Sequence, residues 1–291
     1  MIIVRLMGGL GNQMFQYALG RSLAIKHGMP LLLDKSFYAD EHGVNVTVRE
    51  YDLGHFKIRA VALPDTIARL VSPDRNSGMP RLLERWTSRA FGLKRETSMR
   101  FDPSIFLAPG KTIFEGYWQS EKYFDDIRDF LLAELVPRMP LSSGFIAATQ
   151  EIKLNDLASI HVRRGDYVTN ATAAAYHGTC SIEWYKAAVA AVEARAGVRR
   201  FLVFGDDLDW ARENLRFLAE PIFADEFDLC GAWEDLYLMS HCRHNIIANS
   251  SFSWWAAWLN RFERKIIVAP RKWFVDESDL RDRIPGAWVL V

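Results

Sequence analysis

The sequence predicts a doubly wound α/β architecture, and three observations support this prediction. β-rich runs alternate with helical segments throughout the second half of the chain. The first half opens with a strand, a glycine-rich loop, a helix and a second strand. Polar motifs follow several strands at their carboxyl ends, where open α/β sheets bind ligands. Such alternation is typical of parallel strands joined by crossover helices.

The first half begins with the apolar run MIIVRL, which we predict to be a strand. The loop GGLGNQ follows, then a helical pattern from Met14 to His27, then the strand PLLLD. After this strand the chain becomes irregular, with a basic stretch from Ser72 to Arg100 that is punctuated by proline and glycine.

The second half has the clearer rhythm, because five short β-rich runs are each separated by a segment that can form a helix. The predicted strands are residues 158–162, 200–207, 220–225, 244–250 and 265–270. The predicted helices are residues 181–195, 208–218, 232–242 and 251–262. The stretch PRMPLSSG is the best composition break, so we predict domains at residues 1–143 and 144–291.

Composition indicates a globular protein whose balanced net charge does not favour a strongly charged partner. The chain has 291 residues, of which 49% are hydrophobic, so it can bury two ordinary cores. Lysine plus arginine number 36 and so do aspartate plus glutamate, so nothing indicates nucleic acid as a partner and any anion site must be local.

Cysteine usage and hydropathy predict a cytoplasmic protein. The three cysteines are widely spread and odd in number, which favours reduced thiols. No run approaches the roughly 20 apolar residues that span a bilayer, so we expect no transmembrane segment. Peripheral association with the inner face of the membrane is an alternative within this prediction.

The loop GGLGNQ begins like a dinucleotide-binding fingerprint, with Gly9 and Gly11 after a strand and Asp34 at the end of the next one. Met14 stands where the third glycine would be, which argues against a nicotinamide or flavin cofactor. The alternatives that remain are a turn capped by Asn12, and a ligand site in which Gly11, Asn12 and Gln13 offer amide and backbone donors.

The motif HVRRGDY follows a predicted buried strand and carries two adjacent arginines. Arginine binds phosphate through two oxygens at once, and strand alternation puts His161 and Arg163 on one side. Gly165 allows a close turn, and Asp166 could hold an arginine or accept a proton. A surface turn with an Arg–Asp pair is the structural alternative.

The stretch HNIIANSSFSWWAAWLN predicts a buried strand followed by a helix beginning near Phe252. Small hydroxyl residues cap such a helix, whose first N–H groups and dipole favour phosphate. The substrate-binding candidates here are Asn249, Ser250 and Ser251. The spacing of Trp254 and Trp258 favours a core face over a stacking platform.

The motif FGDDLDW offers carboxylates at a strand end. Asp206 and Asp207 could accept hydrogen bonds from a purine or a ribose, and we expect Asp209 to cap the next helix. Asp207 and Asp209 also resemble an acidic metal-binding triplet. The spacing of His241, Cys242 and His244 does not match structural zinc, so we predict that they pack around a helix end.

Five motifs together resemble the bacterial α-1,2-fucosyltransferases of glycosyltransferase family 11, the group that includes the animal blood-group H-type enzymes. They occur in the family's order over about residues 1–275. These motifs are GGLGNQMFQYALGRSLA, GYWQSEKYF, HVRRGDY, FGDD and NSSFSWWAAWL. The basic segment PRLLERWTSRAFGLK is less similar to the family, which leaves the acceptor open.

The resemblance implies a GT-B fold, in which two Rossmann-like domains face a cleft. It implies inverting transfer of fucose from GDP-fucose to a galactose 2-hydroxyl, without an obligatory metal or other cofactor. The first domain would bind the acceptor, a galactose-terminated oligosaccharide or glycolipid, and the second the donor. Alternatives are an α-1,3-fucosyltransferase and a non-catalytic GDP-sugar-binding protein.

Residue roles follow from the motifs and the resemblance together. Arg163 is the leading ligand of the donor diphosphate, and Arg164 a neighbouring contact. Asn12 would orient the donor across the cleft, and Asp166 and His161 are both candidates for the base.

Overall fold

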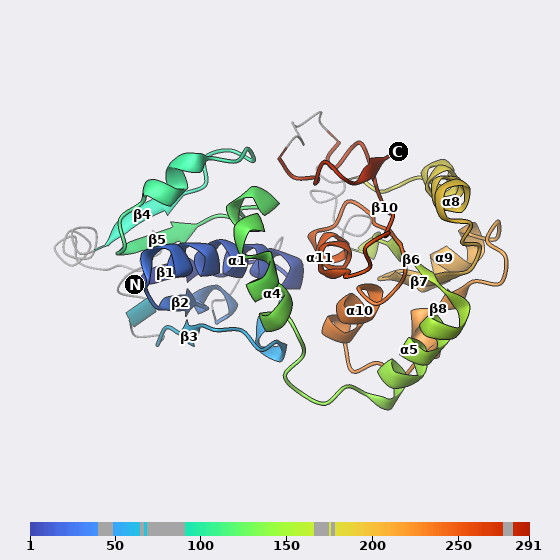
Figure 1. Cartoon of the computed structure of the whole chain (residues 1–291), viewed down its shortest axis with the longest axis horizontal. Coiled ribbons are helices and arrows are strands. Elements are labelled where there is room, and N and C mark those ends of the chain that lie inside the picture. The colour runs from blue at the N-terminus through green and yellow to red at the C-terminus, as the bar shows by residue number, and fades with distance from the viewer. Residues whose placement is uncertain (40–48, 65–66, 69–90, 166–174, 176–177, 276–281) are drawn as a thin grey trace. The chain divides into compact units, whose positions relative to one another are not determined.

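The computed structural model describes residues 1–39, 49–64, 67–68, 91–165, 175, 178–275 and 282–291. The chain divides into two compact units (Figure 1). The first comprises Met1–Val136 together with Arg281–Arg283, and the second comprises Pro137–Leu280 and Ile284–Val291. No helix in the described ranges is both long and apolar enough to cross a membrane.

The first unit is built on a parallel five-stranded sheet in the order β3-β2-β1-β5-β4. Its strands are β1 (Ile2–Arg5), β2 (Leu31–Asp34), β3 (Val61–Ala62), β4 (Gly92–Arg95) and β5 (Thr112–Glu115). The chain runs outward from β1 through β2 to β3, while β5 pairs with the other side of β1. The strand order therefore reverses between β1 and β5.

Helix α1 (Leu10–His27) connects β1 to β2 and is the main helix of this unit (Figure 1). A Cβ on Gly20 would lie 2.6 Å from Val4 and 2.7 Å from Leu31, so only glycine permits this close packing on the sheet. Helix α4 (Arg128–Glu134) closes the unit, and its Glu134 accepts hydrogen bonds from Tyr17 and Arg21 of α1. Short 3-10 helices cover Ser36–Tyr38, Leu53–His55, Pro103–Leu107, Glu121–Tyr123 and Asp125–Ile127.

The second unit contains a parallel six-stranded sheet in the order β11-β10-β9-β6-β7-β8. Its strands are β6 (Ala158–Val162), β7 (Phe201–Gly205), β8 (Ile222–Phe223), β9 (Asn245–Ile246), β10 (Ile267–Ala269) and β11 (Val289–Leu290). The chain runs outward from β6 to β8, returns, and runs outward again from β9 to β11. Here the order reverses between β6 and β9.

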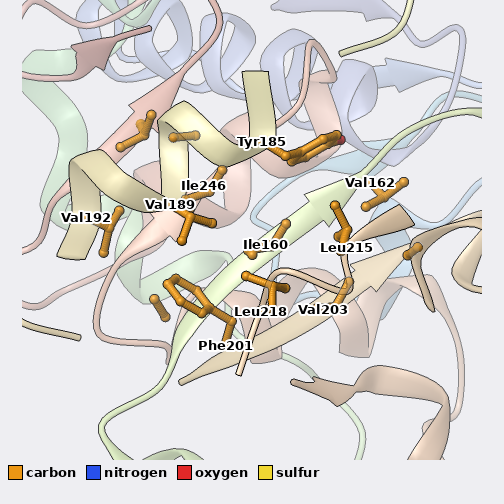
Figure 2. Close-up of a cluster of buried hydrophobic side chains, with 14 of the residues drawn as sticks. Ile160, Val162, Tyr185, Val189, Val192, Phe201, Val203, Leu215, Leu218 and Ile246 are labelled. Carbon is orange, nitrogen blue, oxygen red and sulfur yellow. The ribbon is translucent and has the colours of Figure 1, made fainter. Parts of the chain in front are cut away.

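Helices pack around this second sheet. They are α5 (Ser143–Asn155), α8 (Ile182–Ala196), α9 (Leu208–Asn214), α10 (Ala232–Met239) and α11 (Ser251–Leu259), with a 3-10 turn at Ala224–Glu226. Figure 2 shows Val189 and Val192 of α8 in one buried cluster with Ile160 of β6 and Phe201 of β7. This cluster extends to α9 through Ala211 and includes Leu215, which directly follows that helix. The alternating pattern thus produces the predicted α/β architecture, with one parallel sheet in each unit.

Several local predictions are confirmed. The strand predicted at residues 158–162 is β6 with the same bounds, and all of its residues are buried. Trp254 and Trp258 are core residues, 0% and 2% exposed, with stacked rings 6.3 Å apart. Cys242 is fully buried, and His241 packs edge-on against Tyr237. The three cysteines are unbridged.

Candidate functional site

Three of the sequence motifs lie on adjacent strands of the second sheet. HVRRGDY begins with the last two residues of β6, FGDD begins with the last two residues of β7, and NSS follows β9. Strand β6 lies between the other two strands. All three strands are parallel, so their carboxyl ends meet at one edge. Because ligands of open α/β sheets bind where the strand order reverses, the crevice between β6 and β9 is the expected site.

Arg163 and Asp206 form an ion pair at this edge. Arg163 Nη1 lies 2.6 Å from Asp206 Oδ2, and the two side chains are 19% and 27% exposed. Asp206 also accepts a hydrogen bond from the backbone N–H of Arg164 at 2.8 Å. A Cβ on Gly165 would lie 2.5 Å from Asp206 Oδ2, so glycine is required for this close approach. This ion pair with an aspartate of another motif holds Arg163 at the sheet edge. The Arg–Asp pair expected within HVRRGDY itself would involve Asp166, which lies outside the described residues.

Arg164 has a different environment from Arg163. Its Nε donates to Asp207 Oδ2 at 3.1 Å, and its guanidinium lies 4.2 Å from the ring centroid of Trp210. Asp207 is also the N-cap of α9, because its Oδ1 accepts from the Trp210 N–H at 3.1 Å. The prediction that Asp209 caps this helix is wrong: Asp209 lies one residue inside it, and its side chain is 99% exposed. Arg164 and Asp207 thus fasten the motif to α9.

His161 is buried beside Arg163. The residue is 4% exposed, and its Nδ1 has no hydrogen-bond partner among the described residues. Burial, together with the nearby charge of Arg163, lowers its pKa to about 3, so the imidazole is neutral at neutral pH. Its ring lies 5.6 Å from that of Phe252, in the first turn of α11. A buried polar atom without a partner needs an explanation, and a ligand in the crevice would supply one.

The N-terminus of α11 forms the β9 side of the crevice. Ser250 is the N-cap, as predicted, and its Oγ accepts from the Phe252 N–H at 3.3 Å. Ser251 is the first residue of the helix, so its backbone N–H belongs to the positive end of the helix dipole. Asn249 is buried, and its amide donates to the carbonyls of Gly178 and Trp273 at 3.3 and 3.1 Å. These contacts give Asn249 a role in holding loops together.

In the first unit, the predicted residues lie where the order of the first sheet reverses. Helix α1 begins at Leu10, with Gly9 as N-cap, so the alternative in which Asn12 caps the helix is wrong. Gly11 and Gln13 lie in the first turn and are buried. Gln13 donates to the carbonyls of Gly8 and Glu50 and accepts from the N–H groups of residues 52 and 53. Both the NH₂ group and the oxygen of the Gln13 side chain are therefore hydrogen-bonded to the backbone.

Asn12 differs from Gln13 because, among the residues that the structure describes, only the oxygen of its amide is hydrogen-bonded. Oδ1 accepts from Gln119 Nε2 at 2.6 Å. Gln119 lies in the segment after β5 and Asn12 in the helix after β1, so this bond joins the segments that follow the two strands at which the order reverses. Gln119 was not among the predicted site residues, although the motif GYWQSEKYF contains it.

Two other predictions concern cofactors. Asp34, which a dinucleotide reading would place on a ribose, is fully buried and accepts from the Ser36 N–H at 2.9 Å. Within the part of the chain that the structure describes, no group of three or more His, Cys, Asp or Glu side chains is arranged to hold a metal ion.

Asp166 lies outside the described residues.

The edge of the second sheet thus combines features that suit a phosphate group. Arg163 supplies a fixed positive charge, α11 supplies N–H groups, and His161 supplies a buried ring nitrogen. Arginine and helix N-termini are both common ligands of phosphate.

Comparisons with known proteins find several that are similar to this chain. The sequence model of Glycosyl transferase family 11 matches residues 95–289. An α-1,2-colitosyltransferase of Escherichia coli is 31% identical, over 100% of this chain and 98% of its own length. Galactoside α-(1,2)-fucosyltransferase 1 of Leontocebus fuscicollis is 24% identical, over 87% of this chain and 63% of its own. A crystal structure of the α-1,6-fucosyltransferase NodZ soaked with GDP-fucose is 15% identical with a TM-score of 0.47, over 92% of this chain and 94% of that one.

Proposed function

Because the chain belongs to glycosyl transferase family 11, we propose that it transfers L-fucose from GDP-β-L-fucose to the 2-hydroxyl of a galactose-containing glycan, with inversion. The names of the related α-1,2-colitosyltransferase and galactoside α-(1,2)-fucosyltransferase support the linkage. The name of the fucosyltransferase also favours fucose as the transferred sugar and a galactoside as the acceptor. The name of the colitosyltransferase makes colitose the alternative transferred sugar.

The observation that carries this proposal is the position of Arg163. It lies at the reversal point of the second sheet, close enough to His161 for its charge to act on the imidazole, which packs against α11. A sugar nucleotide places its diphosphate where such donors converge. We therefore assign donor binding to the second unit and acceptor binding to the first.

The chemistry follows from the charge that develops during transfer. As the bond from fucose to the diphosphate breaks, GDP gains negative charge and the sugar carbon becomes cationic. Donors directed at the β-phosphate stabilise this transition state more than the ground state. Arg163 and the N–H groups of α11 would serve this purpose. Losing one such donor typically costs about 2.7–4 kcal/mol of activation free energy.

The acceptor hydroxyl must also lose a proton. His161 is a weak base, because its pKa is lowered to about 3 by burial and by Arg163. Asp166 belongs to the same motif as His161 and remains our candidate for the base. We also propose that no metal is needed, because Arg163 already supplies positive charge at the diphosphate. The unbridged thiols fit a reducing compartment, and we place the reaction in the cytoplasm.

The test is transfer from GDP-fucose to lactose, comparing Arg163→Lys with Arg164→Lys. Wild-type protein should release GDP and form a 2-fucosylated trisaccharide, also in excess EDTA. Arg163→Lys keeps the charge but loses the two-pronged geometry, so kcat should fall about a hundredfold or more. Arg164→Lys should be milder, because Arg164 holds Asp207 and Trp210.

Other outcomes separate the alternatives. Binding of GDP-fucose without any transfer would favour a non-catalytic binding protein. A 3-linked product would indicate an α-1,3-fucosyltransferase, and turnover with GDP-colitose alone would change the donor. Activity lost in EDTA and restored by Mn²⁺ would contradict metal independence. Equal and small effects of the two lysine variants would contradict the role of Arg163.

A further inference from the structure

Three side chains, those of Arg283, Gln119 and Asn12, are connected by hydrogen bonds, and Asn12 is the last of the three. Gln119 donates from Nε2 to Asn12 Oδ1 at 2.6 Å, and its Oε1 accepts from Arg283 Nη1. Arg283 lies 164 positions after Gln119 in the sequence, yet it belongs to the first unit. The order Arg283–Gln119–Asn12 therefore joins the last ten residues of the chain to the start of α1.

The chemistry of arginine determines which group donates and which accepts in these hydrogen bonds. A guanidinium has donors and no acceptor, so it can bind only the oxygen of the Gln119 amide. This leaves the Gln119 NH₂ group toward Asn12, which must then present its own oxygen. Arg283 is 6% exposed, so its charge acts on Gln119 with little screening by water.

The outcome is a defined orientation for the amide of Asn12. With Oδ1 bound to Gln119, the Nδ2 group lies on the opposite side, where a Cβ on Gly8 would come within 2.6 Å of it. Among the described residues, Nδ2 makes no hydrogen bond. Asn12 therefore offers two N–H donors at the crevice between β1 and β5.

The neighbours of Arg283 hold it in place. Asp282 accepts from the Phe101 N–H at 3.0 Å and from Lys122 Nζ at 2.5 Å. Arg283 Nη2 lies 3.3 Å from Met99 Sδ. These contacts fasten residues 282–283 to the first unit independently of Gln119.

The turn that carries Gln119 is itself under strain. Trp118 has φ of 55°, which is unfavourable for a bulky residue. Glu96 holds the turn by accepting from the N–H groups of Tyr117 and Trp118 at 2.7 and 3.0 Å. Burial raises the pKa of Glu96, and these two hydrogen bonds and the charge of Arg283 act in the opposite direction. Arg283 thus supports both the turn and the amide on it.

We propose that Arg283 is a positioning residue that acts through Gln119 to fix the Asn12 amide, with its NH₂ group directed at the acceptor sugar. The inference rests on the proposed function, because it takes the crevice of the first sheet as the place of the acceptor. It assigns roles to Gln119 and Arg283 in acceptor recognition.

The decisive variant is Gln119→Glu. A carboxylate still accepts from Arg283, but it cannot donate to Asn12. The Asn12 amide should then turn over to donate to the new carboxylate, which directs Oδ1 at the acceptor. We expect kcat/KM for the acceptor to fall about a hundredfold, as for a misplaced contact. The KM for GDP-fucose and the melting temperature should stay unchanged. Asn12→Asp, which keeps the oxygen and loses the NH₂ group, should give the same loss.

Variants of Arg283 test the outer link. Arg283→Met should lower kcat/KM for the acceptor about tenfold, and Arg283→Lys should restore part of it. Met99→Leu is the matched control, because it removes the contact of Nη2 with the Met99 sulfur and leaves Nη1 bound to Gln119. In the Gln119→Glu background, Arg283→Met should lower kcat/KM for the acceptor almost no further. The link between Arg283 and the Asn12 amide is already lost in Gln119→Glu.

Two results would overturn the inference: a Gln119→Glu enzyme within threefold of wild type, or losses from Gln119→Glu and Arg283→Met that simply multiply. The proposed function is judged separately, by whether wild type transfers fucose at all. The side-chain amide resonances of Asn12 in protein labelled with ¹⁵N-asparagine give a readout without turnover. They should move in Gln119→Glu and Arg283→Met and stay in place in Met99→Leu, and unmoved resonances in all three variants would also overturn the inference.

Discussion

At the scale of single residues, the two arginines of HVRRGDY show how neighbours in sequence acquire different tasks. Arg164 binds the helix cap Asp207 and the ring of Trp210, whereas Arg163 pairs with Asp206 at the reversal point of the sheet. The motif alone predicted an arginine directed at an anion. It did not predict which acidic residue each arginine would bind, because those partners follow another strand.

His161 provides a prediction about acid stability. Below pH 6.5 the unfolded chain protonates this residue, while the folded chain does so only near pH 3. The folded state therefore binds fewer protons, and its stability falls as the pH drops through this window. By pH 5 the contribution of His161 amounts to about 2 kcal/mol of lost stability, from the linkage relation.

Urea unfolding of wild type and His161→Asn at pH 7.5 and pH 5 measures this contribution. Other groups titrate equally in both proteins, so their effects cancel. The variant should lose about 2 kcal/mol less than wild type between the two pH values. Parallel losses would mean that His161 is protonated in the folded protein.

At the scale of elements, strand β6 was predictable because all five residues are buried and β-rich. Strands β4 and β5 were not predicted. Strand β4 is exposed along its length, and β5 has four residues of mixed polarity, so neither shows a clear pattern. Both strands are defined by their pairing in the sheet, and tertiary pairing often overrides local preference. Because β5 was missed, Gln119 could not be placed next to Asn12.

Helix α10 is tied to α5 through Glu234. This fully buried carboxylate accepts from the Ser142 N–H, the Ser142 Oγ and the Cys230 N–H, each at 2.7 Å. Ser142 is the N-cap of α5. A Cβ on Gly144 would lie 2.2 Å from the Asp228 carbonyl oxygen, so the helix start also packs tightly against this loop.

Glu234→Gln should therefore destabilise the protein. An amide presents one acceptor and a donor, so at least one of the two N–H groups that Glu234 binds loses its partner, which costs about 1–3 kcal/mol. Urea unfolding measures the change. Asp209→Asn on α9, where the side chain is 99% exposed, is the control and should stay within about 0.5 kcal/mol of wild type. If the two variants behaved alike, Glu234 would not hold α5 and α10 together.

At the scale of the whole molecule, the two units repeat one principle. Each is a parallel sheet whose order reverses once, and each carries sequence motifs at that reversal. This arrangement could be predicted from the alternation of strands and helices. The return of Asp282 and Arg283 to the first unit could not be predicted, because no local sequence pattern marks a contact between residues so far apart in the chain.

Nucleotide binding should stabilise the second unit in particular. GDP at a hundredfold excess over its Kd adds about 2.7 kcal/mol to the stability of the unit that binds it. Of the ten tryptophans, all but Trp86 and Trp118 lie in the second unit, so tryptophan fluorescence mainly reports its melting. Arg163→Lys should reduce the shift caused by GDP, and Asn12→Ala should leave it intact. The reverse pattern would place the nucleotide on the first unit.

The course of the last ten residues has a consequence for protein engineering. Asp282 and Arg283 belong to the first unit, whereas Val289 and Leu290 form the edge strand β11 of the second sheet. A gene cut between the codons of Val136 and Pro137 would therefore encode a first half that lacks Asp282 and Arg283. Chimeras meant to exchange acceptor preference between related enzymes must carry these two residues with the amino-terminal fragment, or Gln119 loses the guanidinium that fixes it.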